Sequence, residues 1–295
     1  MKALTRDGWL ERHPYLQPVA RVCGEIERAA GEIEGASPAL PAWEDYRGDY
    51  LAGVPLLQSD AAALDLEPAG RMVVALVQRL AAQALAGNLA AETRALDADL
   101  RRDGNAARRV VGRLLGDDGF TPASPGLLRH LGWTVLARYL APVVEAFRGW
   151  RDDTRWLRRY CPTCGSLPAM AQLVGADPGR QRLLACGCCG TRWQYKRTAC
   201  PFCEGDGQRL RSLAVEGEGG LRIDSCEACG GYLKTYDGQG NEALLLADWS
   251  SLHLDLVARD RGLKRLAASL YEFEIESPTG PPTDDPNGIE TALEA

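Results

Sequence analysis

A chain of 295 residues is long enough for two domains, at about 150 residues each. Apolar residues make up 45% of it, as in an ordinary globular protein, and the net charge of −6 gives no general reason to expect a polyanionic partner. The N-terminus lacks the apolar run of a secretory signal, and no stretch approaches the roughly 18 apolar residues of a membrane span. We therefore expect a protein of the cytoplasm, where cysteines are kept reduced.

The first half of the chain is predicted to be helical. Apolar residues recur at helical spacing after Pro18 and again from Val73 to Leu80, and Ser124-Pro125 is typical of a helix N-terminus. Residues 36–55 hold several prolines and glycines, so we expect a connection with little regular helix there. Cys23 falls on the apolar face of the first of these helices, which favours an unreactive core residue.

No catalytic constellation is visible in the sequence. The three histidines, His13, His130 and His253, are scattered, and each is better explained as a surface or core residue than as a ligand or general base. The helical half also lacks a G-x-G-x-x-G turn, a Walker loop, a G-x-S-x-G elbow and an H-E-x-x-H pair. We predict that the protein is not an enzyme.

Nine of the ten cysteines fall between positions 161 and 229, and eight of them form four C-x-x-C pairs. The first two pairs are separated by 21 residues and the last two by 22, so one unit is written twice at an offset of 39 to 40 residues. A C-x-x-C turn directs two thiolates at one point, and two such turns supply the four soft ligands of a tetrahedral site. We predict two metal sites, one of Cys161, Cys164, Cys186 and Cys189, and one of Cys200, Cys203, Cys226 and Cys229.

Several interpretations of the cysteines stay open. Their even number permits a disulfide framework, although a reducing compartment favours metal. Four thiolates suit iron as well as zinc, so the ions could be structural or could transfer electrons. Cys188 is a spare thiol inside the second pair, where it could exchange with Cys189, be oxidised or be inert.

Short strands are expected between the cysteine pairs, at 169–174, 182–185 and 192–197 in the first unit and at 209–215, 221–226 and 232–236 in the second. Leu245, Trp249, Leu252 and Leu256 then fit one amphipathic helix with Asp248 and Asp255 outside its apolar face, and the leucines from 263 to 270 suggest another turn or two. The fold class is α+β. We place a helical domain at 1–158, four-cysteine ribbons at 159–198 and 199–238, a C-terminal helical segment at 239–275 and a disordered tail at 276–295.

The metal region is basic within an acidic protein. From position 155 to 211 it holds ten arginines and lysines against three acids. Such a surface could bind nucleic acid or dock an acidic protein, and nearby cations would also balance the charge of bound thiolates. A nucleic-acid-binding ribbon therefore stays an alternative.

Particular runs of residues resemble one known family. The run from Arg159 to Pro168, RYCPTCGSLP, resembles the opening of the metal region in the formate dehydrogenase accessory proteins of the FdhE family. The run from Asp224 to Thr235, DSCEACGGYLKT, looks like the second-site pattern of that family. Gly53 to Leu57, GVPLL, resembles a short family motif. The segment from Asp248 to Arg265 is also similar to the family.

The resemblance implies a cytoplasmic, non-enzymatic assembly factor that binds the catalytic subunit of formate dehydrogenase. It further implies a helical domain joined to two rubredoxin-like domains, with the eight paired cysteines as ligands and iron as the suggested metal. No catalytic residue is implied. The sequence departs from the family at Cys188, an additional cysteine, and after Arg265, where residues 266–276 replace an expected asparagine–proline ending. A rubredoxin-like electron-transfer protein is the alternative reading.

Overall fold

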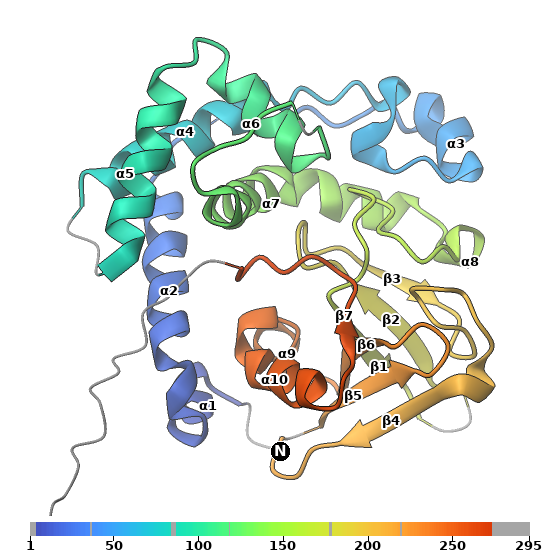
Figure 1. Cartoon of the computed structure of the whole chain (residues 1–295). Helices are drawn as coiled ribbons and strands as arrows, with labels where there is room; N and C mark the ends of the chain where they lie inside the picture. Colours follow the sequence, from blue (N-terminus) through green and yellow to red (C-terminus); the bar gives the residue numbers. More distant parts are fainter. Residues whose placement is uncertain are drawn as a thin grey trace, which may run out of the picture.

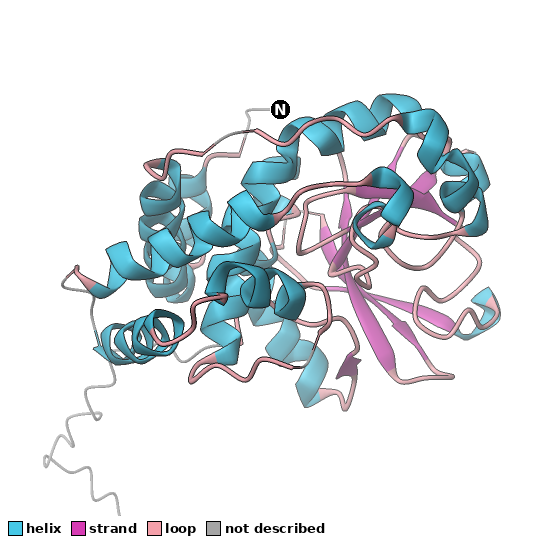
Figure 2. Cartoon of the chain, turned by 90° about the horizontal axis from the view of Figure 1, so that it is seen from above, coloured by secondary structure: helices cyan, strands magenta, loops and turns pink. Residues whose placement is uncertain are grey.

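The computed structural model describes residues 4–35, 37–83, 87–117, 119–176, 179–218 and 220–272. Figure 1 shows most helices of the first half above a mixed β-sheet, with helix α7 (Pro125–Trp150) running between the upper helices and the sheet, and the first two helices running down one side of the molecule. Seen from above in Figure 2, the strands lie to one side of the molecule and the helices occupy the other side and the top. None of the described helices has the length and apolar character needed to cross a membrane.

The helical layer is built around α4 and α7, which contact each other in its middle. Their apolar faces supply a core that includes Leu76, Leu80, Leu127 and Leu131, all buried. The helices of this half are α1 (Arg6–Arg12), α2 (Gln17–Gly31), α3 (Trp43–Ala52), α4 (Glu67–Ala81), α5 (Gly87–Arg101), α6 (Ala106–Leu114), α7 (Pro125–Trp150) and α8 (Asp153–Trp156).

Helix α3 corrects the expectation of little regular helix between residues 36 and 55. Tyr46 is fully buried, and Trp43 stacks on Phe147 and Trp150 of α7 with ring centroids 5.6 and 5.5 Å apart. Packing of aromatic rings against a neighbouring helix thus outweighs the poor local helix pattern. The helix ends at Gly53, whose φ of 88° is left-handed.

The strands form one sheet in the order β3-β2-β1-β6-β5-β4, with β7 also paired to β6. Every strand expected from the cysteine region is present, within two residues at each end. They are β1 (Met170–Val174), β2 (Gln181–Ala185), β3 (Arg192–Tyr195), β4 (Leu210–Ala214), β5 (Leu221–Cys226), β6 (Gly231–Asp237) and β7 (Lys264–Arg265).

The two four-cysteine units meet in the middle of this sheet. Within each unit the neighbouring strands are antiparallel, whereas β1 of the first unit pairs in parallel with β6 of the second, with Met170 opposite Lys234. The α+β fold class is therefore confirmed. The domain boundaries placed from the sequence stay a prediction.

The segment after the second unit differs from the single amphipathic helix that we expected. It contains α9 (Glu242–Leu245), a 3-10 turn (Asp248–Ser251) and α10 (Leu252–Asp260). Asp248 is buried while Leu256 is 52% exposed, the reverse of the expectation. The leucines beyond 262 form no helix among the described residues, because the chain turns at Gly262 and adds β7 beside β6. The expected disordered tail lies outside the described residues.

Candidate metal centres

The first four-cysteine group is closed to solvent. The sulfur atoms of Cys161, Cys164, Cys186 and Cys189 all lie within 4.8 Å of one another, and all four residues are buried. The Sγ atoms of Cys161 and Cys189 are 3.5 Å apart, and those of Cys164 and Cys186 are 3.4 Å apart. No disulfide joins the described cysteines.

The second group has the same composition but is open on one side. Cys200, Cys203, Cys226 and Cys229 also gather within 4.8 Å, yet Cys203 is exposed and Cys229 is half-buried. The Cys200–Cys229 and Cys203–Cys226 sulfur distances are both 3.8 Å. A tetrahedral ion with metal–sulfur bonds of about 2.3 Å would hold its ligands about 3.8 Å apart. The donor set and spacing of both groups therefore fit a tetrathiolate ion.

Local backbone geometry explains why each pair forms a knuckle. The residue after each second cysteine adopts a left-handed conformation, with φ of 80° at Gly165, 72° at Gly190, 60° at Glu204 and 69° at Gly230. This turn aims backbone N–H groups back at sulfur: the amides of Cys188, Phe202 and Gly231 donate to Cys186, Cys200 and Cys229, each over 3.4 Å. Such donors stabilise thiolate charge before any ion binds. Glu204 is the one non-glycine residue in the series.

The short motif 53–57 holds the first group against the helical layer. The amide of Leu56 donates to the carbonyl of Pro162 over 2.9 Å, and the amide of Leu57 donates to Thr163 over 2.8 Å. The hydroxyl of Tyr160 donates to the carbonyl of Gly53 over 2.8 Å. These backbone contacts form a seat under the first knuckle, so the first group is part of the contact between helices and sheet.

Cys188 and Cys23 lie outside both groups of four. Cys189, and not Cys188, joins the first group. Cys188 instead lines a cavity of about 390 Å³ together with Arg113 and Arg129, and its sulfur lies 3.5 Å from the Ser166 hydroxyl. Cys23 is buried as expected, and burial raises the pKa of its thiol to about 12. The Cys23 thiol is therefore protonated at neutral pH.

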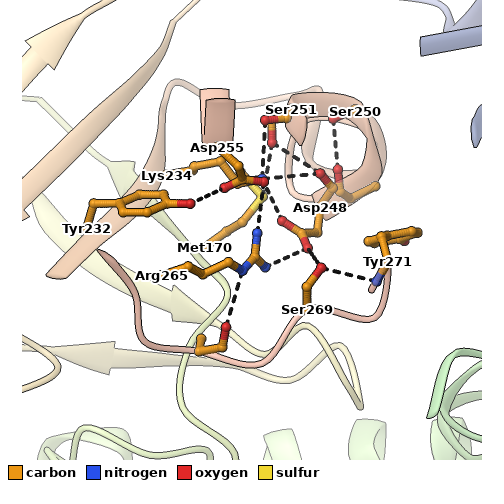
Figure 3. A network of polar contacts seen from close by, with 12 residues as sticks. Met170, Tyr232, Lys234, Asp248, Ser250, Ser251, Asp255, Arg265, Ser269 and Tyr271 are labelled. Atoms are coloured by element: carbon orange, nitrogen blue, oxygen red, sulfur yellow. Dashed lines mark hydrogen bonds and ion pairs between the residues drawn. The ribbon is translucent and has the colours of Figure 1, made fainter. Parts of the chain in front are cut away.

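A buried charge network follows the second group along β6 (Figure 3). The Nζ atom of Lys234 lies 2.6 Å from Asp248 Oδ1 and 2.9 Å from Asp255 Oδ2. The guanidinium of Arg265 on β7 lies 2.7 Å from Asp248 Oδ2 and 2.9 Å from Asp255 Oδ2. Burial opposes ionisation of Asp248, but the two cations hold the pKa of its carboxyl below its ordinary value. Two cations and two carboxylates thus balance, and they tie β7 and α10 to β6.

The sequence predicts three scattered histidines at the surface or in the core, and the structure agrees only in part. His130 is buried in α7, and burial lowers its pKa to about 4, so its ring is neutral at neutral pH. His13 and His253, however, are not scattered in space, because both face the carboxylate of Glu218. The sequence offered no spacing that could have brought these three residues together, since their separations follow no motif.

Comparison with known proteins gives one consistent relationship. No protein-family model matches the chain. The chain is 29% identical over 280 residues to the protein "Protein FdhE homolog" of Stutzerimonas stutzeri, which covers 88% of this chain and 84% of that one. A "Protein FdhE homolog" of Aquifex aeolicus is 30% identical over 144 residues, and "Protein FdhE" of Escherichia coli is 30% identical over 148 residues. These last two matches cover 51% and 48% of the relatives, so the chain spans about half of their length.

A solved structure supports the same relationship at the level of fold. The crystal structure of the FdhE protein from Pseudomonas aeruginosa matches with a TM-score of 0.59, covering 91% of this chain and 96% of that one. The identity of 22% means that this likeness speaks for the fold alone. The sequence matches confirm the resemblance that the cysteine region indicates, and the chain is similar to FdhE proteins in sequence and in fold.

Proposed function

We propose that the chain is a non-enzymatic accessory factor that assists the assembly of formate dehydrogenase by binding its catalytic subunit in the cytoplasm. The observation that carries this proposal is the similarity to FdhE proteins along 88% of the chain, combined with two four-cysteine groups set in one sheet. In this function the protein supplies a rigid surface and no catalytic group. Binding of a client is then a matter of shape and polar complementarity.

The eight paired cysteines are proposed as the ligands of two iron or zinc ions. Each ion would join two knuckles that lie at the same end of an antiparallel strand pair, one before the first strand and one after the second. It would also neutralise part of the negative charge of four thiolates. Structural zinc contributes roughly 10–16 kcal/mol to the folding of small metal domains. An ion in the first group would fix the contact with the helices, and an ion in the second would shape the outer half of the sheet.

The second group and strand β4 form the surface that we propose for the client. β4 is an edge strand, and all five of its residues are half-buried or exposed. The opposite edge, β3, is covered, since Asp153 accepts from the amide of Gln194 over 3.3 Å and Arg151 donates to the carbonyl of Arg192. An edge strand with free backbone groups can add an extended peptide to the sheet. The exposed thiol of Cys203 lies in the same unit.

Charge pairing within the protein argues against the nucleic-acid alternative. Arg182 is buried and donates to the carbonyl of Ala199 over 2.5 Å, and Arg159 donates to the carbonyl of Phe202. Arg211 pairs with Glu227 at 2.8 Å. These side chains were counted in the basic stretch, but Arg159 and Arg182 join the two units, and the exposed Arg211 is paired with an acid of its own unit. A phosphate path needs cations that are free to neutralise it.

A rubredoxin-like electron-transfer function is the second candidate, and the exposure of the second group favours it. Electron transfer to a partner requires that a metal lie near the surface, and Cys203 meets this requirement. The buried first group does not. If the second ion is iron that changes oxidation state reversibly, its visible absorbance changes on reduction and returns on oxidation. A protein that holds only zinc contradicts this candidate.

The test of the proposed function is capture of the tagged full chain from its own cells under anaerobic conditions, with nuclease treatment. We expect recovery of the catalytic subunit of a formate dehydrogenase, identified by mass spectrometry. The matched control is a Cys226→Ser/Cys229→Ser variant whose helical half is verified to be folded. Loss of the subunit from this variant supports a client surface that depends on the second group.

Two results overturn the proposal. One is the absence of any formate dehydrogenase subunit from cells that make the enzyme. The other is bound material that disappears with nuclease, which makes the nucleic-acid alternative the better explanation. Capture that persists in 0.5 M salt, on the order of three times physiological ionic strength, further separates protein docking from electrostatic binding of a polyanion.

A further inference from the structure

Three distant parts of the chain meet at one buried point. His13 follows α1, Glu218 lies in the turn between β4 and β5, and His253 lies in the first turn of α10. The side chains of His13, Glu218 and His253 are 5%, 9% and 12% exposed. Their ligand atoms all lie within 4.8 Å of one another. The cluster is separate from both cysteine groups.

The protons on His13 do not fit a simple hydrogen bond to Glu218. Nδ1 of His13 lies 3.0 Å from the backbone carbonyl of Trp9, which can only accept, so Nδ1 carries the hydrogen. A neutral imidazole has one N–H, and Nε2 then presents a lone pair. That lone pair faces the Glu218 carboxylate, whose oxygens are 3.3 and 3.2 Å away. Either a second proton on the ring or a cation between the atoms must resolve this conflict.

His253 faces the same carboxylate but, among the described residues, lacks the carbonyl contact that His13 makes. Its Nε2 lies 2.8 Å from Oε2 of Glu218, but the two atoms are not aligned for a hydrogen bond, and neither ring nitrogen of His253 makes one within the described residues. Oε2 of Glu218 is likewise buried without a hydrogen-bond partner there. Buried polar atoms of native proteins are seldom left in this state. Two nitrogens and one oxygen thus point at a shared space.

We propose that His13, Glu218 and His253 bind a divalent transition-metal ion such as Zn²⁺. Two imidazoles and one carboxylate are an established donor set for zinc. With metal–ligand bonds of about 2.0–2.1 Å, a tetrahedral ion separates its ligand atoms by about 3.3 Å. The observed separations of 3.2 Å for His13 and 2.8 Å for His253 from Oε2 are close to this value. A histidine that binds a metal through one ring nitrogen usually donates the N–H of the other to a carbonyl or carboxylate, which orients the ring. The Nδ1–H of His13 makes this contact with the backbone carbonyl of Trp9.

The position of the cluster indicates a structural ion. The ring of Tyr15 lies against both imidazoles, with centroids 5.8 Å from His13 and 5.5 Å from His253. His13 also stacks on buried Trp9, whose indole donates to the carbonyl of Ser250 over 2.9 Å. An ion here would join α1, the β4–β5 turn and α10, three segments that are far apart in the sequence. It would bind the folded chain and not the unfolded one, and so stabilise it.

Metal content of the full chain tests this inference, and the test needs no client protein. The chain is equilibrated with zinc alone, dialysed and analysed for zinc. We expect three ions per chain, one for each group, and two ions for Glu218→Gln. The matched control is Glu216→Gln, which removes an exposed acid from the same turn and is expected to keep three. Two ions in both the unchanged chain and Glu218→Gln overturn the proposal.

A second measurement on the unchanged chain guards against a variant that fails to fold. With Co²⁺ in place of zinc, a ligating histidine gives a paramagnetically shifted, exchangeable N–H proton in the NMR spectrum, and tetrathiolate sites give none. We expect this signal from the unchanged chain and from Glu216→Gln. The shifted N–H signal could instead be missing while both thiolate sites are loaded. In that case the imidazoles are bound to Glu218 through their own protons, and the metal site does not exist.

Discussion

The two four-cysteine groups have the same ligands in the same order, yet they occupy opposite environments. The first is buried between the helical layer and the sheet, and the backbone of residues 56 and 57 is hydrogen-bonded to its first knuckle. The second lies at the open end of the sheet, with Cys203 exposed. The difference comes from what packs against each knuckle and not from the knuckle itself. Two duplicated units can therefore have different functions: one stabilises the fold, and the other is available to contact a partner.

Surroundings also set how strongly each group is coupled to the rest of the protein. All four cysteines of the first group belong to the same apolar core as Leu127 and Trp156 of the helical layer, whereas only Cys200 and Cys226 of the second group are buried in that core and Cys203 is exposed. The second group is also attached through β6, and the buried network around Lys234 holds the middle of that strand. Loss of the first ion should therefore spread through the molecule, whereas loss of the second should stay within the outer strands.

The largest expected effect comes from removing two ligands of the first group. In Cys161→Ser/Cys164→Ser the ion is lost, and with it roughly 10–16 kcal/mol of coupled folding free energy, more than most domains possess in total. We expect a chain without a cooperative thermal transition by circular dichroism. Cys200→Ser/Cys203→Ser is the matched variant in the second group, and we expect it to keep the helical signal and a cooperative transition. Equal unfolding of the two variants would contradict the division between the groups.

A smaller but still large effect is expected from Lys234→Met. Removal of one cation leaves Asp248 and Asp255 with a single guanidinium in a buried site, and breaking a buried ion pair typically costs about 3–5 kcal/mol. The free energy of unfolding, measured by denaturant titration, should fall by that amount. Lys264→Met on strand β7 removes an exposed lysine and serves as the control, with an expected change within about 0.5 kcal/mol. A change that small for Lys234→Met would mean that the network adds little to the second unit.

Sequence patterns were sufficient for the parts of the molecule whose ligands or turns are local. The C-x-x-C pairs, the glycines after them and the alternating strands all act within a few residues. The two groups of four cysteines and the six strands between them were therefore predictable. The α+β class followed from the same patterns. The exception is Glu204, which takes a left-handed turn that glycine takes in the other three knuckles.

Features that depend on contacts between distant segments were not predictable. Helix α3 forms because aromatic rings of α7 cover it. Asp248 turns inward because Lys234 of β6 and Arg265 of β7 pair with its carboxylate. The cluster of His13, Glu218 and His253 brings His13 to a residue 205 positions away, with no periodicity to mark the three residues. A sequence pattern indicates the conformational preference of one segment. It does not indicate which charged side chains of other segments will be buried against that segment.

The 53–57 motif that contacts the first knuckle gives a prediction of a moderate change in stability. Gly53 has φ of 88°, and a Cβ atom there would lie 2.0 Å from the Nε atom of Arg158. Gly53→Ala should therefore destabilise the chain by about 1–2 kcal/mol through left-handed strain, and more if Arg158 cannot move. Gly48→Ala lies inside the same helix with no atom within 4 Å of the added carbon, and it should stabilise by about 0.5–1 kcal/mol. Thermal unfolding that moves in the same direction for both would contradict a specific contact at residue 53.

The smallest expected change concerns rate and leaves the folded structure intact. A chelator removes a bound ion by attacking it through an exposed ligand, so the ion of the second group should leave first, through the side of Cys203. In the Glu218→Gln chain, which lacks the third proposed ion, we expect one zinc ion to be released quickly and one slowly into a coloured chelator. Cys203→Ser marks the fast phase, because replacing that ligand should remove or further speed it without changing the slow one. Release of both ions at a single rate would show that burial of the first group gives its ion no protection, and the comparison between the two groups would then rest on folding alone.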